Sequence, residues 1–323
     1  MNNTLMVIGE ALIDFTPTKQ GVALKDVCSF TKHCGGAPIN IAAAAAKLGA
    51  HSKVLTQVGA DAFGDFILET LSLCKVDITA VKRTKQYPTA LAFVALDEKG
   101  NRDFTFYRDP CADLYLSAED ITATMFQDCG ILHFCSVDLV DSPMKQAHLK
   151  SIQLAKEQGA IISFDPNVRL PLWSSKEDCK NTILEFAPYA DILKISDDEL
   201  FFLTGQKDCE QVFTVFPDAT IILLTCGEQG SYLMTKEHRL YEKPIPVKAI
   251  DTAFLYQLLR DGISREQLPH LSKDILQVYL RFSNAYAADS TTKYGAVHAM
   301  ATTQEFHEFL QNFHISNVII SDS

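Results

Sequence analysis

The stretch CGGAPINIAAAAAKLG, residues 34–49, decides what fold and what kind of site this chain is expected to form. Its two adjacent glycines, Gly35 and Gly36, remove side chains where the backbone must come close to another group. Pro38 favours the first turn of a helix, because its missing N–H needs no partner there. Asn40 falls in that turn, and the alanines after it keep the helix slim enough to pack on a sheet. The stretch predicts a glycine-floored pocket with a polar amide at a helix N-terminus.

Short apolar runs alternate with amphipathic segments through most of the remaining sequence. The runs predicted to be buried strands are 5–8, 53–56, 131–134, 160–164, 191–195 and 220–224. Helical periodicity covers 62–73, 143–158 and 197–203. Strands separated by helices indicate parallel pairing with right-handed crossovers and helices on both faces. We therefore expect an α/β fold in which ligands bind at the carboxyl ends of the strands.

Two regions interrupt this alternation. Residues 16–30 are too polar and too rich in turn formers for another crossover helix. Residues 89–96 and 102–107 are rich in strand formers and flank a polar run that is typical of a hairpin turn. These regions predict a small β lid, formed by roughly 16–33 and 87–108, inserted in a single domain of residues 1–323.

Composition excludes several classes of function. The net charge of −11 argues against binding to a nucleic-acid backbone, which needs a basic surface. The nine cysteines are scattered and contain no Cys-x-x-Cys pair, so neither disulfides nor structural zinc are expected. We find no pattern typical of a secretion signal and no apolar run of membrane-spanning length. A cytoplasmic protein without membrane or nucleic-acid partners is the expectation.

The run 34–49 resembles the first signature of the ribokinase-like (PfkB) carbohydrate kinases, and further matches extend from Gly9 to the loop at Gly295. The resemblance implies a three-layer α/β/α sandwich with a mainly parallel central sheet and a small β lid. It also implies a phosphotransferase that uses ATP, Mg²⁺ and K⁺. Within the family, residues 106–108 and 165–169 resemble the fructokinase branch.

One group of residues is implied by the resemblance to hold the sugar. They are Asp14, Gly35, Gly36, Asn40, Arg108, Asn167 and Arg169. Each has a simpler interpretation from the residues alone. Asn40 could simply cap or fill the first turn of the helix, and the two glycines could serve a turn and nothing more. Asp14 could be an acidic turn residue. Arg108 could be a surface ion-pair residue.

A second group is implied to hold the nucleotide and its ions. The residues that resemble ATP-binding positions are Ser196, Thr225, Gly227, Gly230 and Asn284. Glu199 is implied to hold Mg²⁺ through water, and Asp251, Ser290 and Gly295 a monovalent cation. From the residues alone, Ser196 and Glu199 also form a capping box at the start of a helix. The two roles are compatible.

The chain departs from the family pattern after Asp251 and Thr252. The family continues with Thr-Gly-Ala-Gly-Asp, whose amides form an anion hole and whose Asp takes the proton of the sugar hydroxyl. Here Thr252 is followed directly by Ala253 and Phe254, which resemble a later turn of the same helix. The chain is on the order of ten residues shorter than the pattern, and it contains no residue that we assign as catalytic base.

Two explanations account for this gap. Either the protein has lost its catalytic loop, or the sequence omits a mobile, glycine-rich segment between Thr252 and Ala253. Both sides of the junction keep the family pattern, which favours omission because decay would spread further.

Three functions follow from the resemblance. Fructokinase, which converts D-fructose and ATP to fructose 6-phosphate and ADP, is expected if the segment exists. The alternatives are 2-keto-3-deoxygluconate kinase and a catalytically inactive relative that binds a sugar or a nucleotide. A homodimer through the lid is also expected, because unpaired strand edges seek partners.

Overall fold

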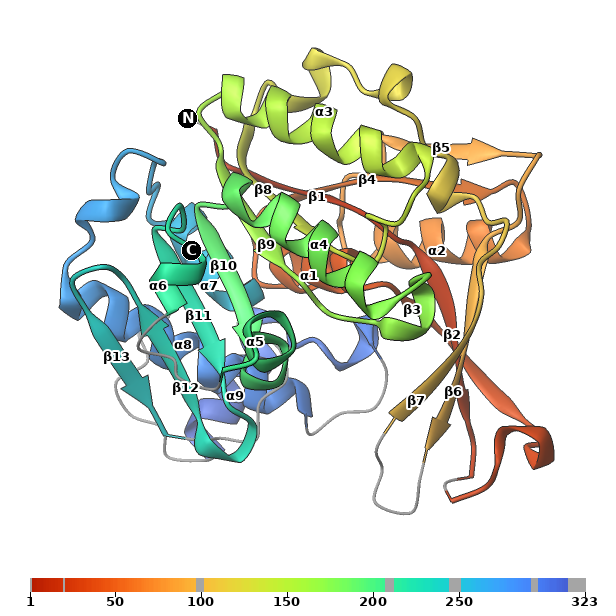
Figure 1. Ribbon diagram of the computed structural model, residues 1–323. Coiled ribbons are helices and arrows are strands. Elements are labelled where there is room, and N and C mark those ends of the chain that lie inside the picture. Colours follow the sequence, from red (N-terminus) through yellow and green to blue (C-terminus); the bar gives the residue numbers. More distant parts are fainter. Residues whose placement is uncertain are drawn as a thin grey trace.

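A nine-stranded sheet forms the centre of the computed structural model, which describes residues 2–19, 21–96, 102–206, 212–243, 251–291 and 296–312. The strands run in the order β13-β12-β11-β10-β9-β8-β1-β4-β5 (Figure 1). Their bounds are β1 Thr4–Ile8, β4 His51–Gly59, β5 Val81–Thr84, β8 Cys129–Cys135, β9 Ile161–Asp165, β10 Ile192–Ser196, β11 Ile221–Thr225, β12 Ser231–Met234 and β13 Arg239–Glu242. Only β12 and β13 pair antiparallel to their neighbours. The mainly parallel sheet is confirmed, and all six predicted strands belong to it.

Helices cover both faces of this sheet, which confirms the three-layer sandwich (Figure 1). The helices are α1 Ala37–Lys47, α2 Ala62–Leu73, α3 Pro143–Glu157, α4 Lys176–Phe186, α5 Asp197–Thr204, α6 Val212–Val215, α7 Asp251–Arg260, α8 Lys273–Thr291 and α9 Thr303–Asn312. Strand β1 shows why two layers are needed, because successive side chains of a strand point to opposite faces. Leu5 and Val7 pack with α1, α7 and α8, whereas Met6 and Ile8 pack with α3 and α4.

A second sheet of four strands, in the order β3-β2-β6-β7, projects from the central layers (Figure 1). Its bounds are β2 Leu12–Pro17, β3 Phe30–Gly35, β6 Ala90–Leu96 and β7 Arg102–Tyr107. The sheet overlaps the predicted lid ranges and extends them to Leu12 and Gly35. The described residues between β2 and β3 form a short 3-10 helix, Leu24–Asp26, and no crossover helix. The predicted turn at 97–101 lies outside the described residues.

One expected position differs from the structure. From the residues alone, Asp14 could be an acidic turn residue after the predicted strand 5–8, but β1 ends at Ile8 and Asp14 lies inside β2, opposite His33 of β3. The chain leaves the central sheet after Gly9 and begins a new strand, which the apolar pattern of this short segment did not reveal. Asp14 therefore belongs to the second sheet.

Two further findings bear on the environment of the protein. In the described part of the chain, no helix combines the length and the apolar character needed to cross a membrane. The eight cysteines that the structure describes are all free, as the sequence predicts.

Candidate functional site

The two glycines of the quoted stretch form a floor at the junction of the two sheets. A Cβ on Gly35 would lie 2.2 Å from the Asp14 carboxylate, and one on Gly36 would lie 2.3 Å from the Glu10 carbonyl oxygen. Gly36 also has a φ of 111°, which side-chain-bearing residues rarely adopt. The floor needs glycine at both positions, and it brings Asp14 against Gly35.

Asn40 lies one turn into α1, beside this floor. Its backbone N–H donates to the Gly36 carbonyl at 3.0 Å. Its side-chain Oδ1 is buried and has no hydrogen-bond partner among the described residues. An unsatisfied buried acceptor costs about 1–3 kcal/mol, which padding of a helix does not explain. A hydroxyl group of a ligand would satisfy this oxygen.

Arg108, which follows β7 directly, is buried rather than placed at the surface. One of its terminal nitrogens donates to Asp113 at 2.7 Å and to Asp138 at 2.5 Å. Burial alone would lower the pKa of Arg108, but Asp113 and Asp138 hold it above its ordinary value. The surface ion-pair interpretation does not describe this arrangement, because both carboxylate partners lie inside the fold.

Glu10 joins the floor to this buried charge cluster. Its Oε1 accepts the N–H of Ala37, the first residue of α1, at 2.7 Å. Burial, and next the Asp138 carboxylate, raise the pKa of Glu10 to about 8. Burial also raises the pKa of Asp138 to about 7, against the opposing charge of Arg108. Sequence reasoning missed both acids, although Glu10 lies two residues after the end of β1, and ligands of this fold class bind at the carboxyl ends of the strands.

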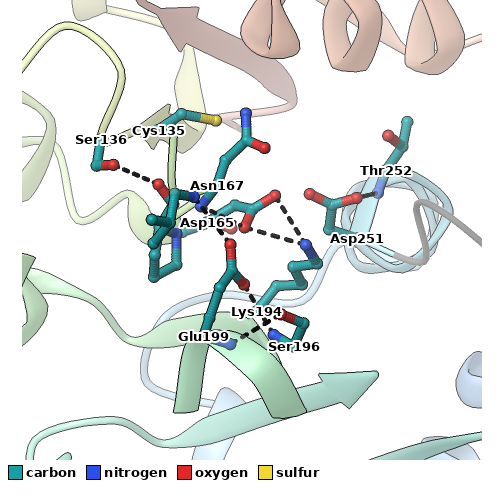
Figure 2. Close-up of polar contacts among 12 residues, drawn as sticks. Cys135, Ser136, Asp165, Asn167, Lys194, Ser196, Glu199, Asp251 and Thr252 are labelled. Carbon is teal, nitrogen blue, oxygen red and sulfur yellow. Dashed lines mark hydrogen bonds and ion pairs between the residues drawn. The ribbon is translucent and has the colours of Figure 1, made fainter. Parts of the chain in front are cut away.

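A second charge cluster lies at the carboxyl ends of β9 and β10 (Figure 2). The Lys194 ammonium contacts both oxygens of Asp165, at 3.1 and 3.2 Å. Burial alone would lower the pKa of Lys194, but Asp165, and then Glu199 and Asp251, raise it. The lysine therefore stays charged at neutral pH. Sequence reasoning did not identify this pair, because its members lie on two different strands.

Glu199 forms the predicted capping box at the start of α5. Its Oε2 accepts the Ser196 N–H at 2.8 Å, and the Ser196 Oγ accepts the Glu199 N–H at 3.2 Å. Its Oε1 accepts the Val168 N–H at 2.9 Å. Burial alone would raise the pKa of Glu199, but Lys194 and these N–H groups lower it. The carboxylate is ionised, and each oxygen keeps a lone pair that a water on a metal ion can use.

A cavity of about 460 Å³ lies between the second sheet and this cluster. It is lined by Phe106, Val168, Arg169, Leu170, Pro171, Ser196, Asp198, Glu199 and Phe202. Asn167, just outside this lining, has a φ of 44°, and its N–H donates to Asp165 at 3.1 Å. The structure thus brings Arg169 from the predicted sugar group next to Ser196 and Glu199 from the predicted nucleotide group.

The other predicted nucleotide residues are distributed over two environments. Thr225 ends β11, and the exposed turn after it is closed by the Cys226 N–H, which donates to the Gly230 carbonyl at 2.8 Å. Gly227 and Gly230 have φ values of 51° and 92°, which this turn requires. Asn284 is fully buried, and its amide donates to the Ser231 hydroxyl and the Leu280 carbonyl. Contact of Asn284 with ATP stays a prediction that would require the amide to leave these partners.

The predicted cation residues are not joined by a hydrogen bond in the described ranges. Asp251 is buried, and its Oδ1 accepts the Thr252 N–H at 3.0 Å. The Ser290 hydroxyl donates to the Ala287 carbonyl at 2.7 Å. Gly295 lies outside the described residues. Within the described ranges, no three His, Cys, Asp or Glu side chains are grouped so as to hold a metal ion. A bound ion would need water or phosphate oxygens as ligands.

Helix α7 runs through the junction where the family pattern is interrupted. It begins at Asp251 and continues through Thr252 and Ala253 without a break. The Asp251 carboxylate lies near Lys194, close to where Asp165 meets that lysine (Figure 2). The sequence just before the helix, residues 244–250, contains no glycine.

Residues 2–303 match the pfkB family of carbohydrate kinases. The chain belongs to this family. Among its curated relatives, the probable fructokinase-2 of Arabidopsis thaliana is 38% identical over 323 residues, which cover 96% of this chain and 97% of the relative. Fructokinase-2 of Solanum habrochaites is also 38% identical, over 309 residues, which cover 93% of this chain and 94% of the relative.

Solved structures of family members have the same fold. A fructokinase from Xylella fastidiosa with bound ATP aligns with a TM-score of 0.88 at 29% identity, covering 97% of this chain and 100% of that one. A fructokinase from Vibrio cholerae O395, bound to fructose, ADP and calcium, aligns with a TM-score of 0.82 at 30% identity. That alignment covers 96% of this chain and 99% of the other. The ribokinase-like fold expected from the sequence is confirmed.

Proposed function

We propose that this protein is an ATP-dependent fructokinase, which transfers the γ-phosphoryl group of ATP to the 6-hydroxyl of D-fructose. The observation that carries the proposal is the glycine floor, where Asp14 packs against Gly35 and the buried Asn40 oxygen has no partner among the residues that the structure describes. The fructokinases of Arabidopsis, Solanum, Xylella and Vibrio that align over nearly the whole chain support the same sugar.

The sugar would lie on this floor, beneath the second sheet. Asp14 can accept hydrogen bonds from sugar hydroxyls, while Asn40 and Asn167 can both donate and accept them. Arg169 would approach from the segment after β9, where it lines the cavity. Arg108 would contribute from the base of the second sheet. That sheet would act as a lid, because phosphoryl transfer to a sugar requires exclusion of water, which competes as the acceptor.

ATP would bind along the carboxyl ends of β10 and β11, with its phosphates near Ser196 and the turn from Thr225 to Gly230. The acids in this region fit Mg²⁺ held through water, because the ionised Glu199 carboxylate keeps free lone pairs. Bound Mg²⁺ would neutralise phosphate charge as it develops. A potassium ion held by Asp251, Ser290 and Gly295 is the corresponding proposal for the monovalent cation.

Phosphoryl transfer depends on a segment between Thr252 and Ala253 that supplies the anion hole and the base. The test is the intact mass of the protein produced from its gene, followed by an assay of ADP release with D-fructose. A mass above the 35.8 kDa of this chain, together with fructose-dependent ADP release, is the expected result. A mass equal to that of the chain and no ADP release would contradict the kinase proposal.

The uninterrupted start of α7 favours one alternative function, in which the protein binds a sugar or a nucleotide without phosphoryl transfer. The carboxylates at the site have other partners, since Asp165 is paired with Lys194 and Glu199 accepts two backbone N–H groups. Calorimetric titration with D-fructose and with a non-hydrolysable ATP analogue measures binding independently of transfer. Binding without turnover would support this alternative.

We also propose a cytoplasmic location and a homodimer formed through the second sheet. The free cysteines are typical of a reducing compartment. One face of the sheet carries Phe15, Phe30, Phe93 and Tyr107, with neighbouring rings 4.9 to 6.4 Å apart and Tyr107 64% exposed. Light scattering gives the mass in solution, and the mass of a monomer at micromolar concentration would contradict the dimer.

A further inference from the structure

The second sheet, in which β2 lies between β3 and β6, has two faces of different character (Figure 1). Successive side chains of a strand point to opposite faces, and residues in register on neighbouring strands point to the same face. The registers place Asp14, His33 and Ala92 together on one face. The other face carries a group of rings in contact with one another, Phe15, Phe30, Phe93 and Tyr107. The polar residues next to the glycine floor are thus separated from the aromatic packing of the sheet.

His33 is the direct cross-strand neighbour of Asp14 on this face. Asp14 on β2 lies opposite His33 on β3, and the Cβ atoms of such a pair are about 4.5–5.5 Å apart. Gly35, two residues after His33 on the same strand, brings its backbone against Asp14, since an added Cβ there would lie 2.2 Å from the Asp14 Oδ2. The Asp14 carboxylate is therefore bordered on β3 by an imidazole and by a residue without a side chain.

The other side of Asp14 is closed. Ala92, its neighbour in register on β6, is fully buried and packs in a small apolar cluster with Leu12 and Phe106. Asp14 and His33, by contrast, are only half-buried. A ligand group that reaches Asp14 therefore has room on the side of β3, next to the imidazole.

The two side chains offer complementary hydrogen-bonding groups. An ionised carboxylate only accepts hydrogen bonds, whereas an imidazole donates at least one in either of its protonation states. One hydroxyl of a sugar can donate to Asp14, while the oxygen of the adjacent hydroxyl accepts from His33. The pair fits two neighbouring hydroxyl groups.

We propose that His33 is a sugar-binding residue that determines specificity, because its imidazole donates to the hydroxyl next to the one that Asp14 binds. The inference rests on the proposed function in one respect, namely that the sugar lies on the glycine floor beside Asp14. It adds to the floor a residue that the sequence did not single out, although His33 directly precedes the stretch 34–49.

The test is calorimetric binding of D-fructose and of its monodeoxy analogues, which each lack one hydroxyl group, and it needs no phosphoryl transfer. His33→Ala is expected to bind D-fructose about five- to tenfold more weakly than wild type, the effect of one lost hydrogen bond. One analogue should show the same loss with wild type and no further loss with His33→Ala, because the contact is then already absent. A residue that only supports the sheet or orients Asp14 would weaken D-fructose and every analogue by the same factor.

Three further variants secure the test. His33→Leu removes the ring nitrogens and keeps the bulk, so it supplies the same comparison if His33→Ala does not fold. His33→Gln keeps a side-chain N–H donor and is expected to recover part of the affinity. Thr31→Ala changes an exposed residue on the same face of β3, further from the floor, and should leave D-fructose binding unchanged. Thermal melting reports whether each variant is folded, and binding of a non-hydrolysable ATP analogue should be the same in all of them.

The possible outcomes separate the inference from the proposed function. Unchanged D-fructose affinity in His33→Ala and His33→Leu, or equal weakening of D-fructose and of every analogue, would overturn the inference even if fructose is phosphorylated. Binding of another sugar in place of D-fructose would overturn the fructokinase proposal. The inference would then stand if His33→Ala weakens that sugar and fall if it does not. Binding of no sugar at all would overturn both.

Discussion

Each half of the site contains one buried cation among three carboxyl groups, but the two clusters satisfy their hydrogen bonds differently. Around Arg108, the guanidinium donates to the carboxylates of Asp113 and Asp138, and an oxygen of Glu10 and one of Asp138 have no partner among the described residues. Around Lys194, the ammonium pairs with Asp165, its one hydrogen-bonded carboxylate in the described part of the chain, and both oxygens of Glu199 accept backbone N–H groups.

The difference indicates two kinds of chemistry from the same set of charges. Buried oxygens without partners suit a ligand that supplies hydroxyl hydrogens, as a sugar does. Carboxylates already held by N–H groups stay ionised and rigid, which suits charges that must be balanced by cations near phosphate. The number of acidic residues alone does not distinguish these functions. The partners of each oxygen do.

The largest effect is expected from Lys194→Met, because it leaves Asp165 buried without its ammonium partner. Removing one side of a buried pair costs about 3–5 kcal/mol of unfolding free energy. Denaturant unfolding measures this loss. Lys25→Met is the matched control, since its pair with Asp26 is exposed and worth less than about 1 kcal/mol. Equal losses in the two variants would contradict the role of Lys194 as the buried cation of its cluster.

Gly36→Ala is expected to have the next largest effect, on the sugar half alone. The new methyl group would lie 2.3 Å from the Glu10 carbonyl oxygen at a φ of 111°. A loss of about 2–4 kcal/mol in unfolding free energy, together with loss of fructose binding, follows from this clash and backbone strain.

Gly159→Ala is the control for this substitution. Gly159 also has a positive φ, of 72°, but a methyl group there would meet no atom within 4 Å. It should cost about 1 kcal/mol and leave fructose binding intact. A Gly36→Ala protein that binds fructose as tightly as wild type would contradict the position of the sugar on the floor.

Glu10→Gln is expected to change how stability depends on pH. The pKa of Glu10 rises from 4.5 to about 8 on folding. Between these pH values the folded protein holds a proton that the unfolded chain releases, so the free energy of unfolding falls as pH rises. The slope from this group is at most about 1.4 kcal/mol per pH unit. The glutamine variant should lose less stability from pH 5 to pH 8.

The other charged groups beside Glu10 bear on this pH dependence. Asp138, whose pKa is raised to about 7, adds a slope of the same sign, while Arg108 opposes both shifts. Some slope therefore remains in the Glu10→Gln protein. Denaturant titrations at several pH values measure it, with Glu69→Gln, an exposed site, as control. Parallel pH curves for wild type and Glu10→Gln would show that Glu10 is ionised at neutral pH.

Asp251→Asn is expected to have the smallest effect on stability. The asparagine oxygen can still accept the Thr252 N–H, so the change in unfolding free energy should stay within about 1 kcal/mol. If Asp251 holds the monovalent cation, the variant loses the response of ATP-analogue affinity to K⁺. Asp274→Asn, an exposed acid on α8, should keep that response. An unchanged response in Asp251→Asn would remove Asp251 from the cation site.

Much of the fold could be predicted because its signals are local. Helix α2 and strand β7 have the bounds that the pattern indicated, and the Ser196–Glu199 capping box is present. Strands β12 and β13, at the antiparallel edge, were not predicted. They are four residues each and lack a long apolar run, so their pairing depends on β11 beside them.

The candidate site could be predicted only in part, for the same physical reason. The adjacent glycines at 35 and 36 indicate a close approach of the backbone even when their surroundings are unknown. Glycine loses more conformational entropy on folding than other residues, so a pair of them points to a steric need. Lys194 in an apolar strand and Glu10 after another carry no comparable local signal. Their importance arises from burial and from acids that approach them in the folded chain.

The sequence by itself determined the fold class, the place of the glycine floor and the interruption of the family pattern after Thr252, because periodicity, glycine pairs and motif length are properties of neighbouring residues. Only the tertiary structure decided which charges meet. Arg108 and Asp138 are 30 residues apart, and Asp165 and Lys194 are 29 apart. The second pair joins the neighbouring strands β9 and β10, whereas the first joins the ends of strands from the two different sheets. Burial then makes each interaction strong enough to determine what the site can bind.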